Sequence, residues 1–454
     1  MAHPTPLDAL YAFLVAAAVT ALLTPVTMRI ARAVGAIDEP RARGLSERPT
    51  PLLGGLAIFA GVFVAALIWL PAGYGEPLRR YAHLWDGVLL GAGLITVVGT
   101  LDDRFDLPPA IKLAGQVLAA VIVVHFGVAV KAITLPFAGK LAFPNAGVTN
   151  AGPVLTVIAL VAMMNVVNFS DGVDGLAAGV CAIIAATLAV IAFDLGRAQP
   201  GVLAALTAGA ALGFLIYNFP PASSFMGDCG ANLLGLLMGV IMVEAAVKTT
   251  AVVSFVLPLI LLTVPFLDTT FVVLKRLKYR RPIYASDSEH FHHRMARIGF
   301  SNRRTIAYLY AWTLLLAGLA LALRFVPYSD HHGHLRTGWT LVMIALGLLV
   351  VAASVYLVYV LEILKFRRLD ANRLRRLRPH ATPAEIEQDV IEHFETGELE
   401  AVSATERPDV HVVGSDVDLG RAEQRVGERQ VDQDRIGAEH ERGGAQAPIA
   451  ADRG

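Results

Sequence analysis

The chain has 454 residues, of which 55% are hydrophobic and only 17% are charged. Its mean hydropathy of +0.57 excludes an ordinary soluble globular protein of this length. The charges of the 38 basic and 38 acidic residues cancel in the net charge, but the two kinds of residue are segregated along the chain. We expect a membrane as a partner and no nucleic acid. The two cysteines, Cys181 and Cys229, form neither a disulfide pattern nor a zinc pattern.

Eleven continuous apolar runs predict transmembrane helices. About 20 apolar residues cross a bilayer core of about 30 Å, and backbone groups in lipid must be satisfied within a helix or a closed barrel. The sequence therefore predicts an all-α membrane protein with about eleven transmembrane helices. The predicted runs lie near residues 8–30, 52–71, 86–101, 111–130, 152–168, 174–195, 201–218, 230–247, 251–274, 306–325 and 339–364.

Basic residues give the expected orientation, because Lys and Arg are enriched in cytoplasmic loops. They cluster after the first run, in the 275–305 loop and after residue 364. No Lys or Arg precedes the first run, which argues for a spanning helix rather than a cleaved signal peptide. We therefore expect the N-terminus outside and the C-terminus in the cytoplasm. Alternation places residues 102–110, 169–173, 219–229 and 275–305 on the cytoplasmic face.

The composition changes near residue 380. The remaining residues are rich in Glu, Asp, Arg, Gln and Gly and contain no long apolar run. Such a stretch buries too little apolar surface to offset the entropy of ordering. The expected organisation is a polytopic membrane domain over residues 1–370 and a cytoplasmic, mostly disordered charged tail over residues 371–454.

The first of four polar clusters joins Asp102 and Asp103 to Asp106 and Lys112. Neighbouring carboxylates repel each other unless a cation lies between them. Mg²⁺ typically uses one or two carboxylates together with substrate phosphates, and Lys112 could meet a phosphate as a point charge. The alternative is a solvated helix cap, for which Asp is a common residue.

Two further clusters lie in short connections between apolar runs. One contains Asn168, Asp171 and Asp174, with its acids expected at the start of the next helix, where the helix dipole favours negative charge. The other runs from Asn218 to Asp228 and includes Phe225, which could stack on a base. We expect Asp228 at a helix N-terminus, where a phosphate or a metal-carrying anion binds.

The fourth cluster groups His290, His292 and His293 with Arg294. Grouped histidines could bind a transition metal. The neighbouring arginines favour an anion such as a diphosphate, because Arg can contact phosphate in a bidentate manner.

Two other classes of protein fit part of these patterns. Residues 102–106 match DDxxD and residues 168–174 match NxxDxxD, spacings found in membrane prenyltransferases. That alternative leaves the Pro49–Gly55 stretch and the His cluster unexplained. A transporter should carry its substrate site near the bilayer midplane, whereas these polar residues lie at one face.

Taken together, the motifs resemble the polyprenyl-phosphate N-acetylhexosamine-1-phosphate transferases, a membrane family with a WecA/TagO-like branch and a related MraY branch. The resemblance covers roughly residues 1–370. It rests on Pro49-Thr50-Pro51 with Gly54-Gly55, Asp102-Asp103 with Lys112, Asn168 with Asp171 and Asp174, Asn218 with Phe225 to Asp228, and His290 with His292-His293.

The resemblance implies a Mg²⁺-dependent enzyme, with Mn²⁺ as an alternative ion, that transfers a sugar 1-phosphate from a UDP-sugar to a polyprenyl phosphate lipid and releases UMP. It further implies a multi-pass plasma-membrane protein with a cytoplasmic active site, and a homodimer is plausible. The implied catalytic residues are Asp102, Asp103, Asp171, His290, His292 and His293. The implied substrate-binding residues are Lys112, Asn168, Asp174, Asn218, Phe225, Arg294 and Arg48. Asp228 and Asp102 are the implied metal ligands.

The His-x-His-His-Arg spacing resembles the WecA/TagO-like branch and so favours UDP-N-acetylglucosamine. The MraY branch would use UDP-muramoyl-pentapeptide. Two stretches depart from the family pattern. The Arg-Lys-x-His segment reads Arg43 to Ser46, which puts its lipid contacts in question, although Arg48 lies close by. The Gly-Asp-x-Gly-Ser segment ends in Ala231, so a hydroxyl near the metal is missing.

Overall fold

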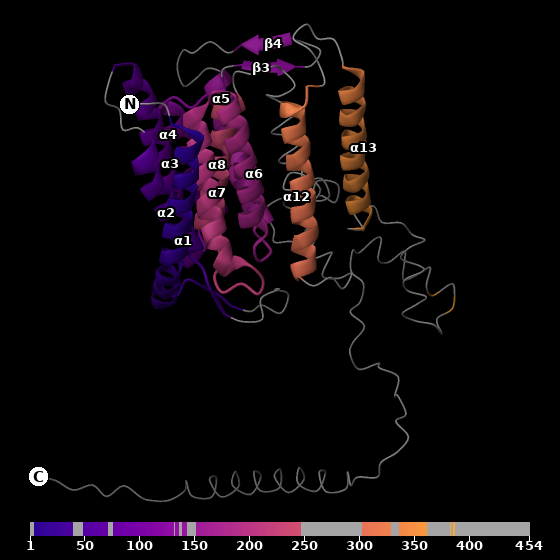
Figure 1. The fold of residues 1–454 in the computed structure, drawn as a ribbon. Helices are drawn as coiled ribbons and strands as arrows, with labels where there is room; N and C mark the ends of the chain where they lie inside the picture. Colours follow the sequence, from indigo (N-terminus) through magenta and orange to yellow (C-terminus); the bar gives the residue numbers. More distant parts are fainter. Residues whose placement is uncertain are drawn as a thin grey trace, which may run out of the picture. The chain divides into compact units, whose positions relative to one another are not determined.

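The structure is a computed structural model that describes residues 4–39, 49–70, 76–130, 132–135, 139–142, 151–246, 302–327 and 336–360, with residues 382 and 385. Contacts divide the chain into residues 1–366 and residues 367–454. All the elements below belong to the first unit, and the predicted boundary near residue 370 lies outside the described residues. The described chain is almost entirely helical, as predicted (Figure 1).

Ten of the eleven predicted runs coincide with a helix, and the run at 251–274 lies outside the described residues. Eight of these helices are long and apolar enough to cross a membrane. They are α1 (Pro6–Val34), α3 (Glu76–Phe105), α5 (Ala151–Ser170), α6 (Leu176–Asp194), α7 (Ala198–Asn218), α8 (Gly227–Ala246), α12 (Asn302–Phe325) and α13 (Thr337–Val360). Two shorter apolar helices, α2 (Gly54–Trp69) and α4 (Pro109–His125), complete the set.

The predicted ends of two helices are wrong in places that matter for the polar clusters. The run at 86–101 is part of α3, which continues to Phe105, so Asp102 and Asp103 lie in its last turn and not in a loop. The helix continues because no residue before Pro108 breaks its hydrogen bonding. Asp174 does not start α6, because Gly175 is the N-cap of that helix with φ +76°.

Two short antiparallel strand pairs were not predicted. β1 (Ile37–Asp38) pairs with β2 (Thr50–Pro51), and β3 (Ala132–Leu135) pairs with β4 (Gly139–Ala142). Runs of two to four residues give too little alternation to be recognised as strands. The first pair brings the chain that leaves α1 back to the start of α2.

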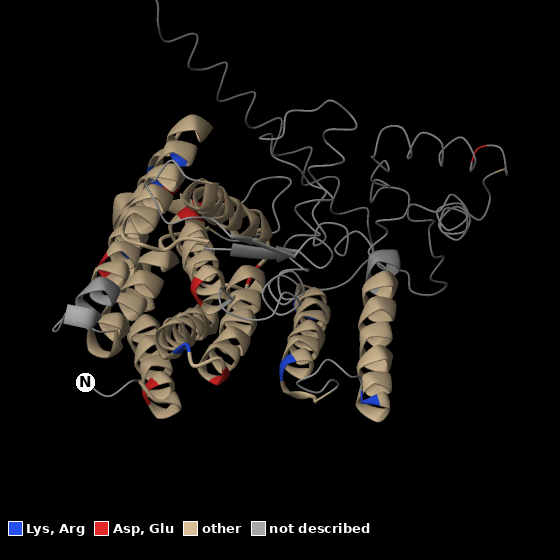
Figure 2. Ribbon diagram, turned by 90° about the horizontal axis from the view of Figure 1, so that it is seen from above, with Lys and Arg blue, Asp and Glu red and all other residues tan. Residues whose placement is uncertain are grey.

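The helix α8 is the best buried of the candidate spans, whereas α1 and α13 expose most of their apolar residues. Charged residues are few along the described helices (Figure 2). Exposed leucines such as Leu14 on α1 and Leu348 on α13 suit a lipid-facing surface, since lipid offers no partner for polar groups.

Glycines bring α2 and α3 very close to the first turn of α8. A Cβ atom on Gly55 of α2 would lie 2.1 Å from the backbone nitrogen of Gly230. A Cβ atom on Gly99 of α3 would lie 2.3 Å from the Cα atom of Cys229. Small residues allow membrane helices to approach this closely. Both crossings place the ends of α2 and α3 beside Asp228.

Candidate active site

Three of the four predicted polar clusters meet at one end of the helical bundle. The clusters around Asp103 and Asp228 are joined by hydrogen bonds between α3 and α8. The cluster around Asp174 is joined to the 219–226 loop, because Ala222 donates its N–H to Oδ2 of Asp174 at 2.9 Å. The prediction that these three clusters share one side is confirmed. The predicted residues His290, His292, His293, Arg294 and Arg48 lie outside the described residues.

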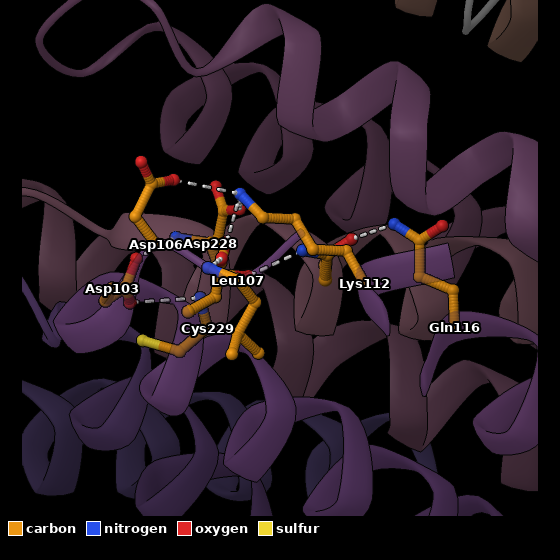
Figure 3. A network of polar contacts seen from close by, with 9 residues as sticks. Asp103, Asp106, Leu107, Lys112, Gln116, Asp228 and Cys229 are labelled. Atoms are coloured by element: carbon orange, nitrogen blue, oxygen red, sulfur yellow. Dashed lines mark hydrogen bonds and ion pairs between the residues drawn. The ribbon is translucent and has the colours of Figure 1, made fainter. Parts of the chain in front are cut away.

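The carboxylate of Asp103 caps the N-terminus of α8 from the neighbouring helix α3 (Figure 3). The backbone N–H of Asp228 donates to Oδ1 at 2.7 Å, and that of Cys229 donates to Oδ2 at 3.2 Å. The first N–H groups of a helix have no partner within the helix, and the helix dipole favours a negative charge there. Asp103 therefore satisfies two such groups and fixes the backbone of Asp228.

Gly227 makes this cap sterically feasible. Its φ is +70°, a left-handed conformation that side chains other than hydrogen disfavour. A Cβ atom on Gly227 would also lie 2.4 Å from Oδ2 of Asp103. A glycine is thus required at position 227 for two reasons, which are its positive φ and the closeness of the Asp103 carboxylate.

Lys112 of α4 lies between two carboxylates that come from different helices. Its Nζ atom is 2.7 Å from Oδ2 of Asp102. The same atom is 3.4 Å from Oδ2 of Asp228 (Figure 3). Oδ1 of Asp102 accepts the backbone N–H of Leu107 at 2.8 Å, which holds the carboxylate in place. Asp102 is buried, so this ion pair supplies the positive charge that a buried carboxylate requires.

Asp102 and Asp103 therefore do not act as a bridged pair. Adjacent residues in an α-helix point about 100° apart, because the helix has 3.6 residues per turn. One carboxylate meets Lys112 and the other meets α8. Asp106 is fully exposed, with its Oδ1 at 3.9 Å from Nζ of Lys112. The three acids of the DDxxD pattern do not converge on one point, and this geometry does not support the prenyltransferase alternative.

Asp171 and Asp174 lie in the turn between α5 and α6, facing the same site. Burial raises the pKa of Asp171 well above its ordinary value, and the negative charges of Asp228, Asp103 and Asp174 raise it further. Burial also raises the pKa of Asp174, against the lowering effect of its hydrogen bond from Ala222. The two acids therefore resist ionising beside the other carboxylates, and a cation among them would favour their charged forms.

The 219–226 loop is held from two sides. Asn218, at the end of α7, accepts the N–H of Gly175 at 2.9 Å and donates to the carbonyl of Ser224 at 3.0 Å. Asn218 therefore ties two site loops together, and its predicted role in substrate binding stays a prediction. Asn168 lies in the last turn of α5, where its carbonyl accepts the N–H of Asp171 at 3.1 Å.

Sequence reasoning missed what the Pro49–Gly55 stretch does. The carbonyl of Pro51 accepts the N–H of Phe225 at 2.9 Å, and the carbonyl of Phe225 accepts the N–H of Gly54 at 3.1 Å. The N–H of Gly55 donates to the carbonyl of Met226 at 3.0 Å. This stretch holds the backbone that leads into Asp228. The consecutive glycines were a signal of close backbone approach.

Two residues of α12 were also missed. The Nε atom of Arg303 donates to the carbonyl of Pro220 at 3.0 Å, and the hydroxyl of Tyr310 donates to the carbonyl of Gly175. Both acceptors belong to loops of the site. The start of α12 is therefore anchored beside these loops, a few residues after the predicted His and Arg cluster in the sequence.

The arrangement combines a carboxylate at a helix N-terminus, a lysine that can exchange partners and two further partly buried acids. A divalent cation would lower the repulsion among the carboxylates, and Lys112 could then contact an anionic group. Positioning and charge neutralisation are the main requirements of phosphoryl transfer. Such a site is suited to joining or cleaving phosphate esters.

Comparison with known proteins points to the same chemistry. Residues 85–246 match the family described as Glycosyl transferase family 4. A probable undecaprenyl-phosphate N-acetylglucosaminyl 1-phosphate transferase of Bacillus subtilis is 34% identical over 319 residues, covering 69% of this chain and 84% of the relative. A decaprenyl-phosphate N-acetylglucosaminephosphotransferase of Mycolicibacterium smegmatis is 35% identical over 339 residues, with 69% and 82% covered. An undecaprenyl-phosphate alpha-N-acetylglucosaminyl 1-phosphate transferase of Escherichia coli is 27% identical over 316 residues, with 68% and 83% covered.

Proposed function

Because the chain belongs to the polyprenyl-phosphate N-acetylhexosamine-1-phosphate transferases of glycosyl transferase family 4, we propose that it transfers N-acetylglucosamine 1-phosphate from UDP-N-acetylglucosamine to polyprenyl phosphate. The products are a lipid-linked diphosphate sugar and UMP, which serve the synthesis of cell-envelope polysaccharide. The observation that carries the proposal is the meeting of Asp102, Lys112 and Asp228 at one point between three helices.

The reaction exchanges one phosphoanhydride bond for another, and the ester bond between the sugar and its phosphate stays intact. An oxygen of the lipid phosphate attacks the phosphorus that bears the sugar, and the bond from that phosphorus to the bridging oxygen breaks. UMP leaves with the electron pair of the broken bond. The attacking phosphate is already anionic, so the reaction requires positioning and charge neutralisation more than a strong base.

The residues present fit a Mg²⁺ ion. Among the described residues, no three acidic, His or Cys side chains form a group able to hold a metal. Mg²⁺ at phosphate sites needs only one or two carboxylates, because substrate phosphates and water supply the other ligands. Asp228 and Asp102 both direct an oxygen toward the position of Nζ of Lys112, a position that favours positive charge. When bound there, the ion would neutralise charge on the reacting phosphates.

The residues of the chain then have distinct parts in the proposal. Asp228 and Asp102 would hold the metal, and Lys112 would move from the carboxylates to a phosphate. Asp103 would fix the backbone of Asp228, and Asp171 would add negative charge beside the metal. Asp174, Asn218 and Phe225, which the 219–226 loop brings together, would hold the uridine. The predicted phosphate contacts of Asn168, Arg48, Arg294 and the three histidines stay predictions.

We further propose that the enzyme is an integral plasma-membrane protein whose site faces the cytoplasm. The basic loops support this orientation through the enrichment of Lys and Arg on that side. The homodimer stays a prediction. The relatives named for N-acetylglucosamine support that sugar over a muramoyl-pentapeptide.

The test is release of UMP by purified protein in detergent with Mg²⁺, polyprenyl phosphate and either UDP-N-acetylglucosamine or UDP-muramoyl-pentapeptide. Release with the first donor alone is expected. Asp228→Asn should lower kcat on the order of 100-fold or more, because it removes a charge at the reacting phosphates. Asp86→Asn is the matched control, since this exposed acid lies on α3 away from the site. Full activity of Asp228→Asn would contradict the assignment, and release only with the second donor would contradict the proposed substrate.

A further inference from the structure

Three amide side chains form a hydrogen-bonded chain beside the site, one helical turn deeper in the bundle. Asn165 of α5 donates from Nδ2 to Oε1 of Gln116 on α4 at 2.8 Å. Gln116 donates from Nε2 to Oδ1 of Asn232 on α8 at 2.8 Å. Asn232 donates from Nδ2 to the backbone carbonyl of Asp228 at 2.8 Å. We call these three residues the amide chain, and it ends on the proposed metal ligand itself.

The direction of the hydrogen bonds in the amide chain is fixed by backbone carbonyls. Asn232 must present its NH₂ group to the carbonyl of Asp228, so its oxygen faces Gln116. Asn165 also donates to the carbonyl of Val161 at 2.8 Å. Gln116 and Asn232 are only 4% and 5% exposed. Buried amides in a membrane interior strongly require partners, so each of these two residues depends on the other.

The amide chain repeats the spacing of the ion pair above it. Gln116 follows Lys112 by four residues on α4, and Asn232 follows Asp228 by four residues on α8. Residues four apart lie on the same face of a helix, one turn on. The contact of Gln116 with Asn232 and that of Lys112 with Asp228 are thus two successive polar contacts between α4 and α8, one helical turn apart. We call these two contacts rungs. Figure 3 shows Gln116 beside Lys112.

These rungs matter because α4 packs most extensively on α3 and α5, and α8 likewise packs on α3 and α5. Long polar side chains therefore reach across between α4 and α8. A shift of either helix along its axis by one residue, about 1.5 Å, would break both rungs together.

We propose that Gln116 and Asn232, supported by Asn165, are positioning residues that hold α4 and α8 in register, so that Lys112 and Asp228 face the same point throughout the reaction. The proposal rests on the proposed function. In the proposed function Lys112 would leave Asp228 to contact a phosphate, so this ion pair would not hold the register during turnover. The neutral amide rung is unaffected by the arriving charges and persists.

The test compares single variants with a swap. Asn232→Leu removes the acceptor of Gln116, and Gln116→Leu removes a hydrogen-bond partner from both Asn165 and Asn232. Gln116→Asn shortens the bridge by one methylene. The swap Gln116→Asn/Asn232→Gln restores the total length and both amides. The measurements are kcat, KM for both substrates, the Mg²⁺ concentration for half activation, and the Mg²⁺-induced shift of the unfolding temperature without substrate.

We expect the single variants to lower kcat about tenfold or more, since small displacements of reacting groups have large effects on rate. KM should change little, and both the half-activating Mg²⁺ concentration and the midpoint of the Mg²⁺ unfolding shift should rise several-fold. The swap should recover most of kcat. Gln199→Leu is the control, because Gln199 on α7 accepts a hydrogen bond from Trp85 of α3 at 3.1 Å outside the amide chain.

The outcomes separate the two proposals. Absence of UMP release by the wild type would overturn the proposed function, and the positioning role would fall with it. Release by the wild type together with folded single variants that keep kcat and Mg²⁺ response within twofold would overturn the positioning role alone. If the leucine variants do not yield folded protein, Gln116→Asn decides, because it keeps a polar group. A swap that stays as slow as the single variants would also contradict the proposal.

Discussion

The backbone N–H of Asp228 donates a 2.7 Å hydrogen bond to Oδ1 of Asp103, so a side chain at the end of α3 caps the beginning of α8. Asp228, which is proposed to bind the metal, is thereby oriented by Asp103, which was predicted to line the reacting phosphates. Both oxygens of Asp103 accept hydrogen bonds from α8, whereas the buried Asp102 pairs with Lys112. This division favours a structural part for Asp103 and a part at the proposed cation position for Asp102.

Asp103→Ala should therefore lower both stability and activity. It leaves the N–H groups of Asp228 and Cys229 without their acceptor, which should lower the free energy of unfolding by about 1–3 kcal/mol. Asp103→Asn retains one acceptor oxygen and should be intermediate. Thermal unfolding in detergent and UMP release measure the two effects. Unchanged stability with complete loss of kcat would instead mean that Asp103 acts directly on the substrate.

Gly227→Ala should disrupt the cap through steric contact with Asp103. The substitution meets both an unfavourable φ of +70° and a Cβ position 2.4 Å from Oδ2 of Asp103. Gly196 is a matched control, because its φ is +69° and nothing lies within 4 Å of its Cβ position. Gly196→Ala should carry only the backbone penalty, on the order of 1 kcal/mol. The loss of stability and of kcat in Gly227→Ala beyond that in Gly196→Ala measures the steric contact with Asp103. Equal losses in the two variants would rule out an effect of that contact.

Lys112→Met should separate metal binding from catalysis. Without the ammonium group, the oxygens of Asp102 and Asp228 have no competing cation, so Mg²⁺ should shift the unfolding temperature at lower concentration. The reacting phosphates lose a positive charge, so kcat should fall on the order of 100-fold. The exposed Arg336→Met is a control for loss of one cation. Weaker Mg²⁺ binding in Lys112→Met would show that Lys112 does not compete with the ion.

The metal-free protein should lose stability as the pH rises because of Asp171. Its pKa in the folded protein is raised well above the ordinary value of 3.8, through burial and neighbouring carboxylates. A raised folded pKa gives stability that is fully present below the unfolded pKa and is lost as the pH rises through the folded pKa. Asp171→Asn removes the contribution of Asp171 to this dependence.

Thermal unfolding with a chelator between acidic and neutral pH checks the effect of Asp171. The variant should be more stable than the wild type at neutral pH and similar to it near the ordinary pKa. Asp86→Asn should follow the wild type. A variant less stable than the wild type at neutral pH would contradict the assigned environment of Asp171.

Much of the architecture followed from the order of residues. Long apolar runs must become helices in lipid, because no other local structure satisfies their backbone groups. Ten of the eleven predicted runs are helices, and the short glycine-containing connections placed three polar clusters at one end of them. The motifs also identified the family, since their order and spacing are unusual in combination.

The directions of side chains and the register between helices required the tertiary structure. The sequence shows Asp102 and Asp103 as neighbours, but the 100° step between them sends one to Lys112 and the other to α8. Gln116 and Asn232 are 116 positions apart and sit in apolar runs where a single amide gives no periodic signal. Composition and spacing thus indicated a membrane enzyme and named candidate residues for its site, and three of the predicted polar clusters lie together in the structure. Only the packing of α3, α4, α5 and α8 decided which partner each polar group meets, because hydrogen bonds between helices depend on distances that local sequence does not encode.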